Sequence, residues 1–274
     1  MKRAGCFLNN HLGFGYLLNS VLAWRLAPRA ASLNSISVLW AGYWLLWLVL
    51  CPSAHAAQLR PEGWQPEAGY RQNGGAIEVA EWVEDGAFVP LTLHLAQAQP
   101  PLSISLTRSD DAEPRIAQIH LQSWQPPLQL STRVRLPKTQ AVEVWIRDGA
   151  GQQWHFRQRV QVLGSSCYAP QLTAPVFGPP QVSLQPQARG LALRTLLAHP
   201  METGLRQNAQ GQPVAQHLLK SIEVSHGPQI LLQVTPYAGL AANPYWHWLL
   251  PAKQQSLNIR WQDQDGRVWQ RLVP

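Results

Sequence analysis

Hydrophobic and polar residues alternate in several short stretches between residues 76 and 163. Residues 88–95 read FVPLTLHL and residues 142–147 read VEVWIR, and similar stretches lie at 104–107 and 116–122. Alternation with a period of two places one side of a β-strand in a core and the other side in water. Gly, Pro and Asp residues separate the stretches at turn-like intervals of about 8–12 residues. We therefore predict that 76–163 forms a β-sandwich domain.

A second block of the same character occupies residues 191–274. The strands that we expect there lie at 221–225, 230–234, 245–249, 257–261 and 268–272. The intervening segment, 164–190, is rich in Pro and Gly and shows no periodicity. Pro-rich stretches tend to be extended and semi-rigid. We predict a linker at 164–190, no long amphipathic helix, and at most one helical turn at 217–220.

The two blocks end in the same pattern. After three alternating apolar residues comes an Asp, then a Gly three positions later and a Trp after another three: Asp148, Gly151 and Trp154, and again Asp263, Gly266 and Trp269. In a hairpin of this kind the Asp opens the turn, the Gly accepts a positive φ, and the Trp begins the returning strand. The repeat indicates two domains of one architecture; the alternative is a coincidence between common hairpin signals.

The first 56 residues read as a secretory leader. They contain basic residues and no acidic residue, and 38–50 form an unbroken apolar run. The run is shorter than the roughly 20 residues of a spanning helix and suits a signal-peptide core. Small residues at Ala54 and Ala56 predict cleavage near Ala56, followed by an N-terminal extension at 57–75. The alternatives are a retained membrane anchor or a lipoprotein site at Cys51.

Removing the leader changes the charge and the thiol count. The whole chain of 274 residues has 22 basic and 15 acidic residues, a net charge of +7. Four basic residues belong to the leader, so the mature charge is 22 − 4 − 15 = +3. This low charge, export and the lack of a clustered basic stripe disfavour nucleic-acid binding. Cys6 and Cys51 leave with the leader, and Cys167 becomes the single thiol of the mature chain.

Conventional catalytic patterns are missing from the sequence. No GxGxxG, GxSxG or P-loop occurs, and the mature histidines show no HExxH and no close pairing along the chain; they are His94, His120, His155, His199, His217, His226 and His247. Such histidines are expected mostly on strand faces, and we predict neither a metal site nor a cofactor. An enzyme with its own active site therefore has little support.

Cys167 follows an expected strand, in a Gly-Ser-Ser-Cys-Tyr sequence at the start of the Pro-rich segment. No neighbouring base lowers the pKa of the thiol, and no second mature Cys can resolve it. An exposed thiol in a loop is accessible to reagents and partners. We expect Cys167 to be exposed and to carry a covalent group; the alternative is a buried structural Cys.

The second block has a distinctive motif. Residues 193–204 read LRTLLAHPMETG, followed by GQPVAQH at 211–217, NPY at 243–245 and the closing hairpin at 263–266. This series resembles the Z subunit of the SoxYZ thiosulfate-oxidation carrier. The motif residues that the resemblance singles out are His199, Pro200, Met201, Glu202, Thr203 and Gly204.

The first block is similar to the Y subunit of the same carrier. The similarity rests on EDGAFVPLT at 84–92, on STRVRL at 131–136, and on a last strand that leads to a Cys-containing tail. The chain thus resembles a fused Y–Z carrier of the type associated with quinoprotein dehydrogenases. The resemblance implies an all-β protein with two immunoglobulin-like sandwiches, Y-like at 76–163 and Z-like at 191–274.

The resemblance also implies a function for the tail. In that family a Cys on a terminal arm covalently holds sulfur intermediates and presents them to periplasmic enzymes, and Cys167 stands at that place. The arm here comprises Gly164, Ser165, Ser166 and Tyr168 around the thiol, and it continues into the second domain. The implied partners are sulfur-oxidation enzymes or a quinoprotein dehydrogenase, in the periplasm and without a lasting membrane anchor.

A second reading makes the chain a non-covalent docking module for an exported quinoprotein dehydrogenase. Residues 245–248 read YWHW and place aromatic rings on both faces of one expected strand. If one face is exposed, Trp246 and Trp248 would offer a partner surface. If both faces are buried, the two residues belong to the core.

Overall fold

The computed structural model describes residues 74–124, 126–164, 177–208, 210–250 and 256–274. The predictions for the leader at 1–56, with its cleavage near Ala56, lie outside the described residues. So do those for Ser165, Ser166, Cys167 and Tyr168. Among the described residues, no helix is both long enough and apolar enough to span a bilayer.

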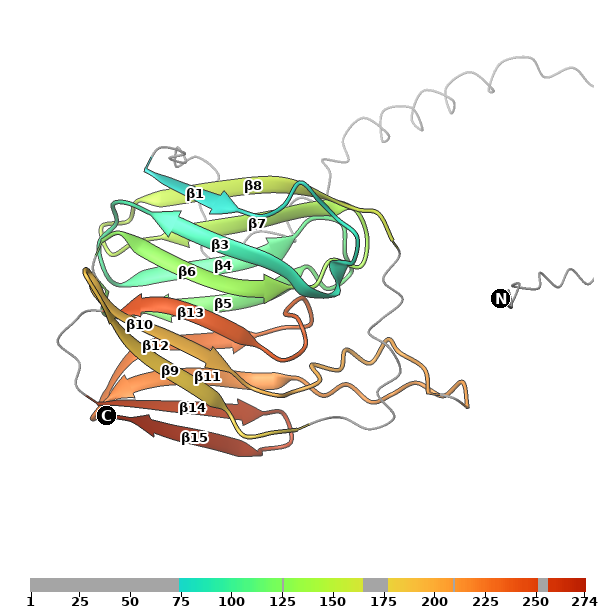
Figure 1. Cartoon of the computed structure of the whole chain (residues 1–274). Helices are drawn as coiled ribbons and strands as arrows, with labels where there is room; N and C mark the ends of the chain where they lie inside the picture. Colours follow the sequence, from blue (N-terminus) through green and yellow to red (C-terminus); the bar gives the residue numbers. More distant parts are fainter. Residues whose placement is uncertain (1–73, 125, 165–176, 209, 251–255) are drawn as a thin grey trace, which may run out of the picture. The chain divides into compact units, whose positions relative to one another are not determined.

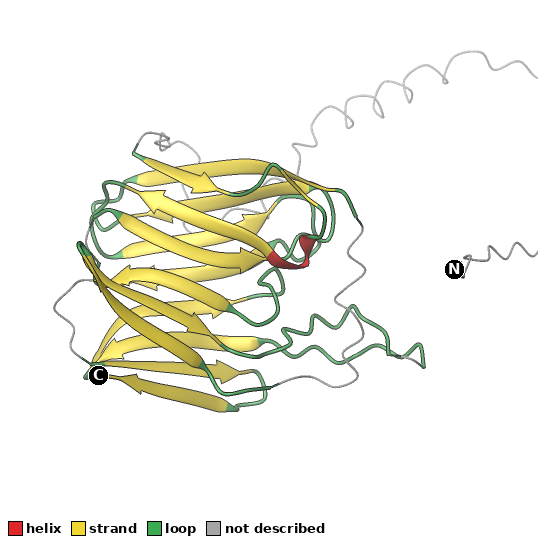
Figure 2. Ribbon diagram, in the orientation of Figure 1, coloured by secondary structure: helices red, strands yellow, loops and turns green. Residues whose placement is uncertain are grey.

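The described residues form fifteen β-strands and one short 3-10 helix (Figure 1, Figure 2). The first group of strands is β1 (Gly75–Glu78), β2 (Trp82–Val83), β3 (Val89–Leu95), β4 (Leu102–Arg108), β5 (Arg115–Leu121), β6 (Leu128–Val134), β7 (Gln140–Arg147) and β8 (Gln153–Val162), with the helix η1 (Gly86–Phe88) before β3. The second group is β9 (Gln181–Gln187), β10 (Gly190–Leu196), β11 (Leu219–His226), β12 (Gln229–Pro236), β13 (Tyr245–Leu250), β14 (Leu257–Asp263) and β15 (Val268–Val273). The predicted all-β class, with immunoglobulin-like sandwich domains, is confirmed.

Two sheets run through both groups of strands. One has the order β1-β3-β6-β13-β10-β9, and the other has the order β15-β14-β11-β12-β5-β4-β7-β8-β2. The groups meet where β13 pairs with β6 and where β12 pairs with β5, both antiparallel. Each sheet therefore continues from one domain into the other. The sequence, which shows two separate blocks of strands, does not predict this continuity.

The core lies between the sheets because alternate residues of each strand point inward. In β14, Leu257, Ile259 and Trp261 are fully buried while the residues between them are partly exposed. The bulkiest buried side chains include Trp154, Trp246, Trp248 and Trp261. Trp246 and Trp248 stack with ring centroids 5.4 Å apart. Trp246 and Trp248 therefore belong to the core, while Tyr245 and His247 on the other face of β13 are partly exposed.

Both predicted hairpins are present. Asp148 Oδ1 accepts hydrogen bonds from the backbone N–H groups of Ala150 and Gln152, at 3.0 and 2.8 Å. Gly151 has φ +80°, a conformation that favours glycine. The second hairpin repeats this geometry, with Gly266 at φ +83° and Asp263 Oδ1 accepting from Arg267 N–H at 2.7 Å.

Three sequence predictions need correction. The linker at 164–190 contains β9 and the start of β10, and Pro186 is tolerated in β9 because that strand lies at a sheet edge. The helical turn at 217–220 is wrong, because β11 begins at Leu219 in a strand conformation. The short strands β1 and β2 were not predicted, since two to four residues carry too little periodicity to stand out.

Candidate functional site

The end of β8 is where the predicted carrier arm begins. Beyond Val162, Leu163 N–H donates to Val83 O at 2.9 Å and Gly164 N–H donates to Glu84 O at 3.1 Å. Both bonds lie beside the parallel pairing of β2 with β8. Gly164 and Leu163 are exposed. The structure thus fixes the root of the arm at Gly164, while Cys167 follows outside the described residues.

The HPMETG motif forms a loop after β10. His199 and Asn243 exchange two bonds: His199 N–H donates to Asn243 Oδ1 at 3.1 Å, and Asn243 N–H donates to His199 O at 2.8 Å. Met201 and Asn243 both have positive φ, at 46° and 51°. Met201 is fully buried, and its carbonyl accepts from both terminal nitrogens of Arg135, at 3.2 and 3.3 Å. The loop therefore ties the Z-like domain to a residue of the Y-like domain.

The rest of the motif folds the loop back on itself. Glu202 Oε2 lies 2.9 Å from Arg206 Nη2, and Glu202 O accepts from His217 N–H at 2.8 Å. Gly204 has φ +83° at the bend, and Thr203 O accepts from Gln216 Nε2 at 3.4 Å. This pairing brings His217 beside His199, with ring centroids 5.2 Å apart.

A polar cluster results, which we call the His199 cluster and which comprises His199, His217, Asp263 and Asp265. One donor atom each from His199, His217 and Asp263 lies within 4.8 Å of the others. His217 Nε2 is 2.9 Å from Asp263 Oδ2, and His217 Nδ1 is 3.2 Å from Asp265 Oδ2. His199 Nδ1 accepts from Met201 N–H at 3.1 Å, and its buried Nε2 has no hydrogen-bond partner among the described residues.

Burial sets the charge states within the cluster. His199 is fully buried, and burial is the main reason that its pKa falls to about 4; nearby His217 lowers it further and Asp263 opposes the change. His199 is therefore neutral at pH 7. Burial tends to raise the pKa of Asp263, but the hydrogen bonds from His217 and from Arg267 N–H outweigh it and leave the pKa below its usual value. Asp263 is accordingly a carboxylate.

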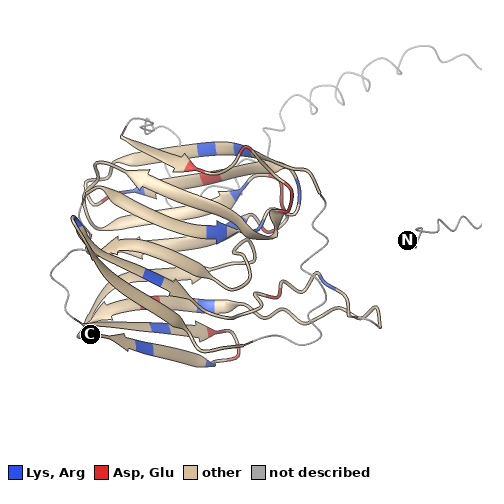
Figure 3. Ribbon diagram, in the orientation of Figure 1, with Lys and Arg blue, Asp and Glu red and all other residues tan. Residues whose placement is uncertain are grey.

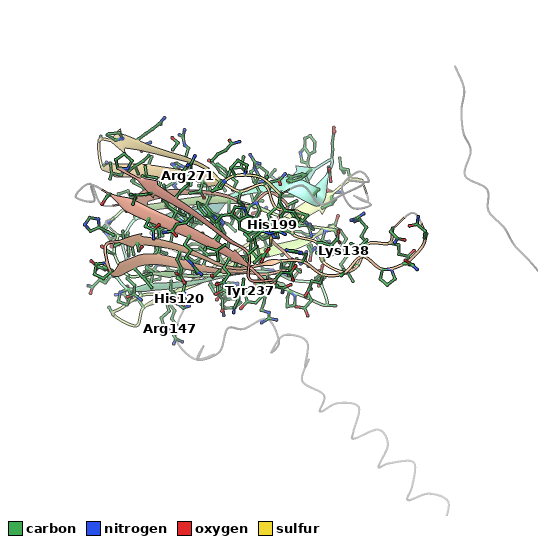
Figure 4. The ribbon with its side chains drawn as sticks, turned by 90° about the horizontal axis from the view of Figure 1, so that it is seen from below. His120, Lys138, Arg147, His199, Tyr237 and Arg271 are labelled. Atoms are coloured by element: carbon green, nitrogen blue, oxygen red, sulfur yellow. The ribbon has the colours of Figure 1, made fainter. Side chains whose placement is uncertain are left out.

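Aromatic rings cover the cluster. The Phe177 ring lies 5.5 Å from the His199 ring and 5.2 Å from the His217 ring, measured between centroids. The Trp269 ring lies 6.0 Å from that of His199, and the Arg267 guanidinium lies over the Phe177 ring at 4.2 Å. Apolar faces around polar atoms lower the local dielectric and strengthen electrostatic interactions between them. Figure 4 marks His199 among its neighbouring side chains.

The sequence motifs contain the individual residues of this cluster, but they do not predict that the residues lie together. His199 and Asp263 were singled out in motifs, and His217 ended the second matching stretch. His199 and His217 are far apart along the chain, but the fold brings their rings together. Their contact depends on the loop pairing of Glu202 with His217, which no local periodicity reveals. Figure 3 shows that Lys and Arg residues are distributed over several strands.

Comparison with known proteins gives the family. Residues 68–167 match the model of the sulfur oxidation protein SoxY, and residues 184–273 match the model of the sulphur oxidation protein SoxZ. Together the two matches cover most of the chain, in the order Y then Z. The chain therefore belongs to the SoxYZ-type sulfur-oxidation carriers, with both domain types fused in one chain.

The solved structures that match the chain are less similar to it. The sulfur carrier protein SoxY from Chlorobium limicola f thiosulfatophilum is 27% identical over 33% of this chain and 76% of its own, with a TM-score of 0.29. Bovine butyrophilin is 11% identical over 73% of this chain and 97% of its own, with a TM-score of 0.21. No curated protein sequence matches the chain.

Proposed function

We propose that the mature chain is an exported carrier that holds a sulfur intermediate covalently on Cys167 and presents it to partner enzymes. One observation supports this most directly: the SoxY-type match ends on Cys167 itself. Cys167 stands three positions beyond Gly164, the first residue of the arm, whose N–H donates to Glu84 O just after β2. The thiol thus follows the sheet at the point where the Y-type domain ends.

Chain length limits how far the thiol can travel. Three residues span at most about 10 Å when fully extended, so the Cα atom of Cys167 stays within that distance of Gly164. The chain then continues to Phe177, which packs on the His199 cluster. The residues at both ends of the segment, Gly164 and Phe177, are held in the structure, so the length of the chain between them limits the reach of the thiol. A partner enzyme must therefore approach the end of β8 closely.

The chemistry of loading requires a partner. Joining the Cys167 thiol to the sulfur of an anion forms an S–S bond, releases one proton and removes two electrons. The carrier supplies the thiol, and an oxidoreductase must accept the electrons. The chain in this proposal is a carrier and not an enzyme. Its partners are periplasmic oxidoreductases of sulfur oxidation, or a quinoprotein dehydrogenase.

The Z-like domain supports the Y-like domain in this proposal. The sheets continue from one domain into the other, and Arg135 binds the carbonyl of Met201 across the junction. A rigid base keeps the root of the arm in a defined place, so that partner docking positions the thiol. The predicted leader accounts for export to the periplasm, where the partners are expected.

The docking-module reading loses its main support. It depended in part on an exposed aromatic face in residues 245–248, and the side chains of Trp246 and Trp248 are fully buried. The other face of the same strand, with Tyr245 and His247, is only partly exposed. The covalent carrier is the better-supported function.

A matched pair of variants in the native host tests the proposal. Cys167→Ser removes the thiol with a small change in volume, and Ser166→Ala alters the adjacent residue but keeps the thiol. We expect Cys167→Ser to abolish respiration on the reduced sulfur compound that the host uses, tested with thiosulfate and sulfide, and Ser166→Ala to retain it. Full respiration with Cys167→Ser, at normal protein abundance, would refute the covalent carrier.

A further inference from the structure

We propose that the His199 cluster is a binding site for a divalent transition-metal ion of the zinc type, held by His199, His217 and Asp263. This inference concerns the Z-like domain and does not depend on the function proposed for Cys167. Two imidazoles and one carboxylate form a donor set that zinc accepts, and three protein ligands leave a fourth position open for water or an anion.

The first support is the orientation of His217 and Asp263. His217 Nδ1 lies 3.2 Å from the Asp265 carboxylate, while Nε2 faces Asp263 Oδ2 at 2.9 Å. A metal-bound His typically donates its second ring N–H to a carboxylate, which fixes the ring and its tautomer. Asp265 is placed for that role. Asp263 Oδ1 is engaged by Arg267 N–H at 2.7 Å, so Oδ2 is the oxygen directed at the cluster.

The second support is the state of His199. Its side chain is fully buried and its Nε2 has no hydrogen-bond partner among the described residues. A buried polar atom without a partner is unfavourable, and such atoms in native proteins call for an explanation. A bound cation supplies the missing partner.

Binding has a definite structural cost. Nδ1 of His199 accepts from Met201 N–H at 3.1 Å, so the proton of the neutral ring is on Nε2. Coordination through Nε2 moves that proton to Nδ1 and breaks the bond to Met201. At His217, the metal replaces the proton that joins Nε2 to Asp263 Oδ2. The metal–nitrogen bond to the buried Nε2 offsets the loss of the hydrogen bond from Met201 N–H.

Charge and spacing are compatible with a cation. Two carboxylates, those of Asp263 and Asp265, lie against His217, while Arg267 places one guanidinium over the neighbouring Phe177 ring, so acidic side chains outnumber the basic one around the site. Donor atoms around tetrahedral zinc lie about 3.3 Å apart, given metal–ligand bonds of about 2.0–2.2 Å. The donor atoms here lie within 4.8 Å, so the widest pair must close by up to about 1.5 Å. His217, whose side chain is 19% exposed, has room to turn.

Metal titration of the purified full chain tests the site. The thiols are first alkylated with iodoacetamide and metal is stripped with a chelator, so that cysteines do not contribute. Co²⁺ is then added and followed by its visible absorption, which is much stronger for a four-coordinate ion than for the hydrated one, and Zn²⁺ is used as the competitor. We expect one Co²⁺ per chain, displaced by one Zn²⁺.

Three variants separate this site from adventitious binding. His217→Gln should weaken binding by more than the roughly 10- to 100-fold that loss of an outer-shell partner costs, and Asp265→Asn should weaken it by about that amount. His120→Gln is the matched control, because His120 is exposed on β5 and lies outside the cluster (Figure 4). It should bind like the unaltered chain.

Either of two results would overturn the proposal. One is no four-coordinate Co²⁺ spectrum in the unaltered chain. The other is equal affinity in His217→Gln and His120→Gln, which would assign the metal to surface histidines. If His217→Gln fails to fold, Asp265→Asn decides, because the Asp265 side chain is 67% exposed and carries little of the packing.

Discussion

Trp246 is the residue whose loss should most clearly show that the two domains share one core. It lies in β13, where it pairs with Thr132 of the Y-like domain on one side and with Thr195 of the Z-like domain on the other. Its side chain is fully buried and stacks on Trp248. The change Trp246→Ala therefore removes a large ring from the junction of the domains.

The size of the effect follows from burial. Replacing a buried Trp by Ala typically costs about 3–5 kcal/mol, because apolar burial is lost and a cavity remains. Each kcal/mol lowers the midpoint by about 2–4 °C for a folded region of this size. Trp246→Ala should thus lower the thermal midpoint by about 6–20 °C. Trp246→Phe keeps a ring and removes an Nε1–H that has no described partner, so it should cost less.

Thermal unfolding followed by near-ultraviolet circular dichroism measures this effect. We expect a single transition for both domains, before and after the change, because β13 belongs to the packing of each. Trp82→Ala is the matched control, since Trp82 is 61% exposed, and surface changes usually stay within about 0.5 kcal/mol. A Trp246→Ala shift no larger than the control, or two separate transitions, would refute the shared core.

Three further changes probe the turns and loops that hold this architecture, each measured by denaturant unfolding. Asn243→Ala should lower the free energy of unfolding by about 2 kcal/mol, because it removes the acceptor for His199 N–H and places Ala at φ 51°. Asn243→Gly should lower it less, because glycine adopts this positive φ without strain. Equal stability of the two variants would contradict the argument from backbone strain. Asp148→Ala should lower the free energy of unfolding by about 2–4 kcal/mol, because three backbone N–H groups lose their acceptor. An unchanged denaturation midpoint would show that the turn forms equally well without the Asp148 carboxylate. Gly86→Ala should cost about 3 kcal/mol or more, because the added Cβ would meet Leu136 O at 1.8 Å, and a neutral result would mean that this close approach relaxes at little cost.

The sequence predicts most strands from their alternation, although β4 and β7 are buried on both faces and the expectation that one of their sides lies in water is wrong. The stretch at 142–147 and the hairpin after it appear as predicted, since Asp148 and Gly151 specify the turn through local chemistry. The sequence pattern does not reveal β9, because Pro186 interrupts the alternation, and Val182 and Leu184 are only partly buried in the structure. Edge strands carry weak periodicity, and for that reason sequence reasoning misses them.

Long-range pairing is the part that the sequence does not reveal. The join of β13 with β6 and of β12 with β5 depends on strand partners far apart in the chain. The same is true of the His199 cluster, whose members come from the motif loop and from the last hairpin. His217 ends a stretch that resembles the family, but it meets Asp263 only because the loop folds back.

The chemical state of Cys167 in protein purified from the native host tests the central claim most directly. Mass spectrometry of the peptide that contains Cys167, without and with a thiol reductant, measures it. We predict a sulfur-containing adduct on Cys167 that the reductant removes, leaving the free thiol. A Cys167 that is unmodified in cells actively oxidising sulfur compounds would contradict the covalent carrier.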